Sequence, residues 1–135
     1  MTSKRKLAAV LATGCLITAC KVRTSYHEGE VCLASDPTNG STRAVVTFDS
    51  CVSSSESVDD VSCSVSINEE ATEILVVGSA QTSIGRIRGQ NDDCNVLAAT
   101  CDVPDLPPGS YVLEHAGQRQ AVELPATAPC PRPSF

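Results

Sequence analysis

Short runs of β-prone residues, separated by polar turns, make up the chain beyond residue 29. The clearest run is 61–67, where Val61, Cys63, Val65 and Ile67 alternate with three serines. A period of two places the apolar side chains on one face, which predicts a half-buried strand. Residues 69–77 contain helix formers as well, but Ile74-Leu75-Val76-Val77 favours a strand there. The other runs that predict strands are 30–34, 43–48, 84–87, 96–99, 106–115 and 118–124.

Turn signals join several of these runs into hairpins. The cluster Asp36-Pro37-Thr38-Asn39-Gly40 lies between two β-prone runs, and Ala116-Gly117 separates the last two. The polar stretches 49–60 and 89–94 are expected to be loops, the first of them mobile. Many short strands over about 100 residues are typical of a sandwich. The pattern therefore predicts an all-β fold, a small β-sandwich domain over residues 29–135.

The first twenty residues have a different pattern. Lys4-Arg5-Lys6 precedes an uncharged apolar run from Leu7 to Ala19. This run is shorter than the roughly 20 residues that a transmembrane helix needs. A buried amphipathic helix is the alternative, but the run is apolar on all sides. Residues 1–19 are therefore interpreted as a helical, cleaved signal peptide, followed by a polar tether at 20–28.

The end of this run, Ile17-Thr18-Ala19-Cys20, resembles the lipobox of bacterial lipoproteins. The resemblance implies cleavage before Cys20, a diacylglyceryl group on its thiol and an acyl chain such as palmitate on its amine. Two or three acyl chains hold a protein on a membrane without spanning it. Ala12-Thr13-Gly14-Cys15 is a weaker candidate because its first residue is Ala. Lys21 follows Cys20 where Asp would imply retention in the inner membrane, so the resemblance favours an anchor in the outer membrane.

Removal of Cys15 and lipidation of Cys20 leave six cysteines for the exported domain. An even number in an oxidising compartment predicts three disulfides, with 15 possible pairings. A zinc site needs closer ligand spacing than the sequence offers, and a catalytic thiol would leave an odd cysteine. The pairing expected from the sequence is Cys51–Cys63, Cys94–Cys101 and Cys32–Cys130, in which the first two bridges close short polar loops.

Composition limits the possible partners. All 16 acidic residues and seven of the ten basic residues lie beyond Cys20, which gives the mature chain a net charge of −9. Such a chain is repelled by nucleic-acid phosphates and by anionic headgroups, so contact with the membrane is expected only through the lipid anchor. The sequence has no Trp, two Tyr and two Phe, too few aromatics for stacking platforms that bind sugars or single strands.

No residue pattern indicates a catalytic centre or a cofactor. His27 lies in the expected tether, and His115 ends a strand beside a Gly turn, where it is expected to face solvent. No Gly-x-Ser-x-Gly motif accompanies them. The Arg86-x-Arg88 pair is expected to balance nearby carboxylates on one strand face. Oxygen ligands for Ca²⁺ are offered by Asp59-Asp60, Asn91-Asp92-Asp93, Asp102 and Asp105. Their spacing does not match an EF-hand loop, so no metal site is assigned to them.

The segment Leu106-Pro107-Pro108-Gly109-Ser110-Tyr111 resembles the entry to the penultimate strand in bacterial immunoglobulin-like domains. This resemblance implies that Tyr111 is a corner tyrosine, with its ring in the core and its hydroxyl on a nearby backbone group. The whole chain resembles the small Cys-rich envelope lipoproteins of delta-proteobacterial type, a resemblance that implies no specific activity.

Three functions remain open from the sequence. The first is a non-catalytic envelope lipoprotein on the bacterial outer membrane. The second is a protein-binding module, an inhibitor or assembly factor that uses disulfide-closed loops to hold another envelope or extracellular protein. An exposed apolar patch at the tip of loop 51–63 or 94–101 would favour it. The third is a domain that binds Ca²⁺ or a small ligand, which requires the acidic loops to converge.

Overall fold

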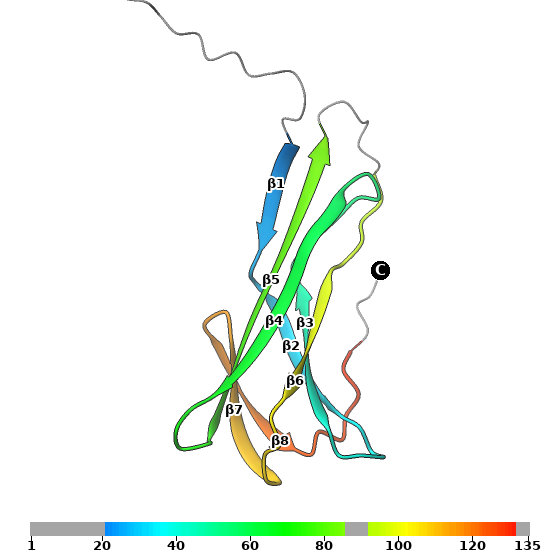
Figure 1. The fold of residues 1–135 in the computed structure, drawn as a ribbon. Helices are drawn as coiled ribbons and strands as arrows, with labels where there is room; N and C mark the ends of the chain where they lie inside the picture. Colours follow the sequence, from blue (N-terminus) through cyan, green and yellow to red (C-terminus); the bar gives the residue numbers. More distant parts are fainter. Residues whose placement is uncertain (1–20, 86–91, 132–135) are drawn as a thin grey trace, which may run out of the picture.

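The computed structural model describes residues 21–85 and 92–131, and this part of the chain is all-β (Figure 1). The expected signal peptide at 1–19, both lipobox candidates with Cys15 and Cys20, and the Arg86-x-Arg88 pair lie outside the described residues. No helix in the described ranges is long and apolar enough to cross a membrane. The strands are β1 (Lys21–Tyr26), β2 (Gly29–Ser35), β3 (Thr42–Phe48), β4 (Ser57–Ile67), β5 (Glu73–Gly85), β6 (Ala98–Val103), β7 (Gly109–His115) and β8 (Gln118–Leu124).

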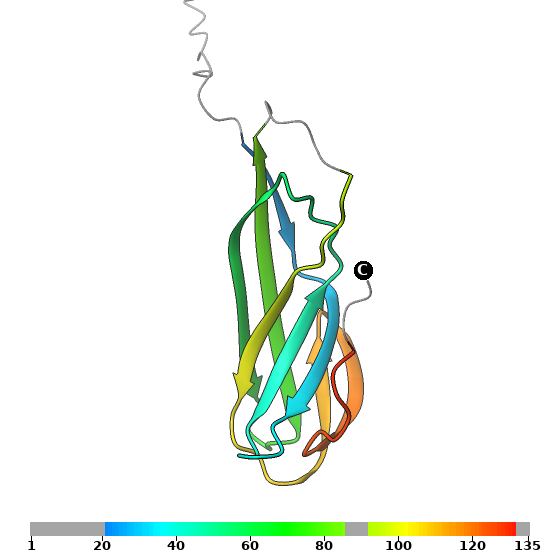
Figure 2. The same cartoon turned by 90° about the vertical axis from the view of Figure 1, so that its right-hand side faces the viewer.

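Two sheets form a sandwich, as the sequence predicted. The larger sheet has the order β1-β5-β7-β8, and β4 pairs with the other side of β5. The smaller sheet has the order β2-β3-β6 and lies in front of the larger one in Figure 2. All pairings are antiparallel except β5 with β7, which run parallel from Glu73↔Val112 to Val76↔His115. The strand β5 is central because it pairs with β4 on one side and with β7 and then β1 on the other.

The core forms where alternating residues of both sheets face each other. Burial alternates along β3, in which Ala44, Val46 and Phe48 are buried, and the same alternation appears in β5 and β7. Phe48 is the largest fully buried side chain, consistent with the scarcity of aromatics. The remaining core consists of aliphatic residues, and burial of each side chain stabilises the fold by at most about 1.5–3 kcal/mol. They include Leu33, Ile74, Val76, Ala80, Ala99, Val103, Leu113 and Leu124.

Tyr111 confirms the corner-tyrosine prediction. Its ring joins the core cluster, and its hydroxyl donates a hydrogen bond to the carbonyl oxygen of Pro107 at 2.6 Å. The bond ties the start of β7 to the connection that leads into it. The hairpin that follows is also as predicted, with a two-residue turn in which Ala116 and Gly117 have φ of 49° and 77°. Positive φ at both central residues is typical of a type I′ turn.

The expected tether at 20–28 is wrong for most of its length. Lys21–Tyr26 is a strand that pairs with the end of β5, from Lys21↔Gly85 to Tyr26↔Ala80. The chain then crosses to the smaller sheet at Gly29. A Cβ atom at Gly29 would lie 2.1 Å from the carbonyl oxygen of Thr47, so no side chain fits there. Because Gly29 has no side chain, the chain can pass close to β3 here, and one N-terminal segment pairs with the larger sheet through β1 and with the smaller sheet through β2.

Three other boundaries differ from the prediction. Residues 74–77 and 84 belong to one strand, β5, because the polar residues between them alternate faces and Thr82 is buried. Strand β4 begins at Ser57, so residues 57–60 of the expected loop 49–60 belong to a strand that pairs with β5. The strand expected at 96–99 is shifted to β6. In each case the pairing partner, which the local sequence does not reveal, sets the boundary.

The six cysteines form three disulfides, but two of the expected pairings are wrong. Cys32–Cys130 forms as expected. The other bridges are Cys51–Cys94 and Cys63–Cys101 instead of Cys51–Cys63 and Cys94–Cys101. Cys63 lies on β4 and Cys101 on β6, so their bond joins the two sheets. The observed bridges therefore connect segments 38 and 43 residues apart and do not close short loops.

Candidate functional site

The two sides of the sandwich differ in how they are closed. On one side the edge strands β4 and β6 are joined directly by Cys63–Cys101. On the other side the edge strands are β8 of the larger sheet and β2 of the smaller one, and the C-terminal tail at 125–131 passes beside both (Figure 2). A cavity of about 730 Å³ lies between β2, β8 and this tail. We call it the edge cleft, and its volume lies within the range of ligand sites.

The wall formed by β2 offers backbone hydrogen-bonding groups. The backbone amide of Phe48 donates to the carbonyl oxygen of Leu97, just before β6. Because successive residues of a strand point their backbone groups to opposite sides, the even-numbered residues of β3 face β6 and the odd-numbered ones face β2. The register of β2 on β3 then directs the backbone groups of Glu30 and Cys32 into the sheet. Those of Val31 and Leu33 point to the open edge. The carbonyl of Val31 confirms this direction because it accepts a bond from a side chain across the cleft.

The wall formed by β8 presents the inward-facing residues of the last hairpin. The side chains of Gln118, Gln120 and Val122 share a face with His115, because directly paired residues point to the same side of a sheet. The side-chain amide of Gln120 donates to the carbonyl oxygen of Val31 at 3.1 Å. Gln118 and Gln120 are nevertheless exposed, because no strand of the smaller sheet covers them.

His115 lines the cleft, and the expectation that it faces solvent is wrong. Only 2% of the residue is exposed. Its Nδ1 lies 3.0 Å from the carbonyl oxygen of Val76. Because a carbonyl only accepts, Nδ1 carries the proton, and Nε2 of the neutral ring is a hydrogen-bond acceptor. Among the described residues no group bonds this Nε2, although it is buried.

An unsatisfied buried polar atom is uncommon in a folded protein and often marks a binding site or a bound water. The period of two that begins at Tyr111 and Leu113 places His115 on the inner face, so the sequence contained this signal. The unbonded Nε2 of His115 is therefore the atom of the edge cleft that most directly indicates a ligand.

The tail forms the outer boundary of the cleft. It leaves β8, its amide at Ala126 donates to Oγ of Ser35 at 2.9 Å, and Cys130 bonds to Cys32 on the outer face of β2. None of the described tail residues 125–131 makes a backbone–backbone hydrogen bond. The tail is thus fixed at its two ends but does not occupy the open edge of β2 as a strand.

The charge of the cleft is negative. Glu30 and Glu123 line it, and Glu123 accepts a hydrogen bond from the hydroxyl of Ser110. The cationic side chain among the lining residues, Arg119, forms ion pairs with Glu73 and Glu114 on the outer face of the larger sheet. The cleft therefore favours ligands that donate hydrogen bonds or carry positive charge.

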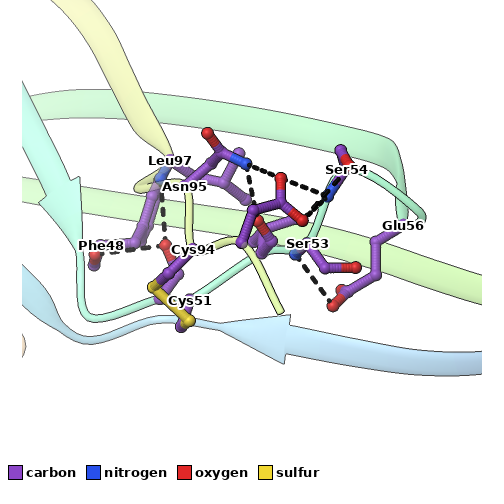
Figure 3. Close-up of a disulfide and its surroundings, with 11 residues drawn as sticks. Phe48, Cys51, Ser53, Ser54, Glu56, Cys94, Asn95 and Leu97 are labelled. Carbon is purple, nitrogen blue, oxygen red and sulfur yellow. Dashed lines mark hydrogen bonds between the residues drawn. A yellow bond between two sulfur atoms is a disulfide. The ribbon is translucent and has the colours of Figure 1, made fainter. Parts of the chain in front are cut away.

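The loops at the far end of the sandwich hold Asp92 and Asp93, two of the acidic residues that the sequence offered as cation ligands, whereas Asn91 lies outside the described residues. Figure 3 shows that Cys51–Cys94 ties these loops together beside a network of hydrogen bonds. Asp93 accepts bonds from the amide and hydroxyl of Ser54, at 3.0 to 3.2 Å, and these bonds, the amide first, lower the pKa of the Asp93 carboxyl. Glu56 accepts from the hydroxyl of Thr82.

The acidic groups do not converge. Asp59 accepts a bond from Ser83, and Asp102 pairs with Arg43 on the smaller sheet. Within residues 21–85 and 92–131, no three His, Cys, Asp or Glu side chains are placed to hold a metal ion together. The carboxylates described here tie the chain to itself, which leaves the Ca²⁺ hypothesis without support from their arrangement.

The expected disulfide-closed loops do not exist either, because neither 51–63 nor 94–101 is closed on itself. Two valines of the first segment are exposed, Val58 by 51% and Val61 by 38%, but both lie on strand β4. The remaining histidine, His27, is exposed between β1 and β2. Of the residues considered from sequence, His115 and the Cys32–Cys130 bridge meet at the edge cleft.

Comparison with known proteins adds no assignment to this geometry: no protein-family description, no curated protein and no solved structure matches the chain.

Proposed function

We propose that the chain is an exported, non-catalytic lipoprotein of the bacterial outer membrane, anchored through Cys20, that binds another envelope or extracellular protein in the edge cleft. The observation that carries the binding role is the buried Nε2 of His115, which lacks a partner in the described structure and lines a cavity of about 730 Å³. The anchor rests on the resemblance of Ile17-Thr18-Ala19-Cys20 to a lipobox.

The position of the cleft suits a protein held on a membrane. Strand β1 begins at Lys21, directly after Cys20 in the sequence, and Lys21 pairs with Gly85, the last residue of β5. His115 pairs with Val76, nine residues back along β5. At about 3.3 Å per residue this separation is about 30 Å. An acyl anchor on Cys20 would place the near end of the sandwich at the bilayer and direct the cleft away from it.

The environment of His115 supports a binding role over a catalytic one. Its Nδ1 is bonded to a backbone carbonyl and not to a carboxylate, the partner that orients the histidine of a catalytic triad. All six cysteines of the described chain are in disulfides, so none of them supplies a thiolate. The cleft offers a hydrogen-bond acceptor, side-chain amides and an open strand edge, which are groups that recognise a partner.

The anchor is tested by the intact mass of the protein isolated from membranes. We expect a mature chain that begins at Cys20 and carries the added mass of its acyl chains. Cys20→Ser should leave the chain unprocessed or release it from the membrane fraction. Cys15→Ser is the matched control and should change neither processing nor location. A mature chain with a free thiol at Cys20 and no added mass would contradict the anchor.

The binding role is tested by site-specific photo-crosslinking in the native envelope. A photoreactive residue placed at Gln118, in the cleft, should give a discrete adduct with another protein. The same residue at Gln81, exposed on the outer face of the larger sheet, is the control and should not give that adduct. Absence of a protein adduct from the cleft, or equal adducts from both positions, would contradict the proposed binding site.

A further inference from the structure

We propose that the partner enters the edge cleft as an extended peptide segment that adds to β2 as a fourth strand of the smaller sheet. This inference rests on the proposed binding role and names the kind of ligand. Such strand addition uses backbone groups for affinity and alternate side chains for specificity.

The edge of β2 is unpaired, although the tail passes beside it and is held at Ser35 and Cys32. In the half of the sandwich that contains the cleft, four strands of the larger sheet, β4-β5-β7-β8, face only three of the smaller one, β6-β3-β2. With β4 and β6 joined by a disulfide, β8 has no counterpart in the smaller sheet. The place beside β2 and opposite β8 is where a fourth strand would lie, and the tail leaves it without backbone pairing.

The edge of β2 already makes one hydrogen bond of the kind that an added strand would make. The backbone groups of Val31 and Leu33 point into the cleft, and an added strand would bond to them. In the free protein the side-chain amide of Gln120 donates to the carbonyl of Val31, as the backbone N–H of an added strand would. Gln120 thus satisfies one group that an incoming peptide would otherwise reach.

The residues that line the cleft also restrict the side chains of the peptide. Every second side chain of an added strand would point inward, toward β8 and His115. Because Nε2 of His115 accepts hydrogen bonds, one inward position should carry a hydroxyl, amide or amino group. The carboxylates of Glu30 and Glu123 oppose an acidic peptide. The ligand class is therefore an extended peptide, neutral or basic, with a donor side chain at one inward position.

The experiment uses the mature lipoprotein in detergent micelles and a library of synthetic peptides of about six residues, the usual length of a strand. Retained peptides are resynthesised with single N-methyl groups, each of which removes one backbone donor. Methylation at the positions that face β2 should weaken binding about tenfold, because each removes a hydrogen bond and adds a clash. Methylation at the intervening positions should have little effect.

Two variants of His115 separate binding from folding. His115→Asn keeps a donor near the Nδ1 position, for the carbonyl of Val76, and loses the acceptor in the cleft. His115→Gln keeps an acceptor near Nε2 and loses that bond. We expect His115→Asn to abolish the preference for a donor side chain and His115→Gln to retain it, whichever of the two is less stable. Gln81→Ala is the neutral control.

A third variant tests the competition at the strand edge. Gln120→Val should tighten peptide binding several-fold, because it frees the carbonyl of Val31 and keeps a β-prone residue in β8. If no peptide is retained, if N-methylation weakens binding equally at all positions, or if His115→Asn leaves the donor preference unchanged, strand addition is wrong. The photo-crosslinked adduct would stand in each of those cases, so the binding role is judged separately.

Discussion

The Cys63–Cys101 bridge should stabilise this fold more than a bridge within one loop would. It links the edges of the two sheets across 38 residues of sequence. On the chain-entropy account, closing a loop of that length removes about 4 kcal/mol of unfolded-state entropy, compared with about 2.5–3 kcal/mol for the short loops expected from the sequence. A domain of this size has a total stability of about 5–15 kcal/mol, so the loss of one bridge should be large.

The perturbation is the double variant Cys63→Ala with Cys101→Ala, purified in its oxidised form. Equilibrium unfolding in denaturant should show a free energy of unfolding lower by about 4 kcal/mol, and the denatured variant should contain no free thiol. The matched control is Cys51→Ala with Cys63→Ala. Because these two residues belong to different bridges, the control should leave Cys94 and Cys101 without their partners and lose the contribution of both bridges.

The two variants distinguish the pairings directly. If Cys51 and Cys63 were bonded to each other, their joint replacement would remove a single short loop and cost less than the Cys63/Cys101 variant. A Cys63/Cys101 variant with two free thiols, or with a loss of less than about 1 kcal/mol, would refute the reasoning that this bridge holds the sheets together.

Three further effects follow from individual contacts. Tyr111→Phe should lower the free energy of unfolding by about 1–1.5 kcal/mol, measured in denaturant, because the carbonyl of Pro107 loses its donor. Gly29→Ala should lower the melting temperature by several degrees, because the new Cβ would lie 2.1 Å from the carbonyl oxygen of Thr47; Gly85→Ala, whose Cβ would meet no atom within 4 Å, is the control. The contact of Asp93 with the facing loop should weaken as pH falls below the ordinary value of 3.8, because the lowered pKa stabilises the fold only while the carboxyl is ionised. Amide shifts of the loop should report this titration with a midpoint below 3.8, and Asp93→Asn should abolish it.

Elements built from local contacts could be predicted from the sequence. The closing hairpin, the hairpin around Asn39-Gly40 and the corner role of Tyr111 depend on turn residues and alternation within about twenty residues. Each was expected and each is present. The inner position of His115 also followed the alternation of β7, but its place beside a Gly turn suggested exposure, which is wrong.

Elements set by distant contacts could not be predicted. Strand β1 is polar and resembles a tether until its partner, the end of β5, is known. The cysteine pairing was wrong where proximity in sequence guided it, because β4 and β6 meet at one edge only after the sheets have packed. The edge cleft depends on a difference in strand number between two sheets, which no local pattern records.

The most direct test of the account is amide hydrogen exchange along β2, residue by residue, with and without a retained peptide. In the free protein the amides of Glu30 and Cys32 should be protected by β3, whereas that of Val31 should exchange much faster because it faces the open edge. Addition of the peptide should protect Val31 and leave Glu30 and Cys32 unchanged. Equal protection of Val31 in the free protein, or no change in its exchange at saturating peptide, would contradict an unpaired edge of β2 that accepts an added strand.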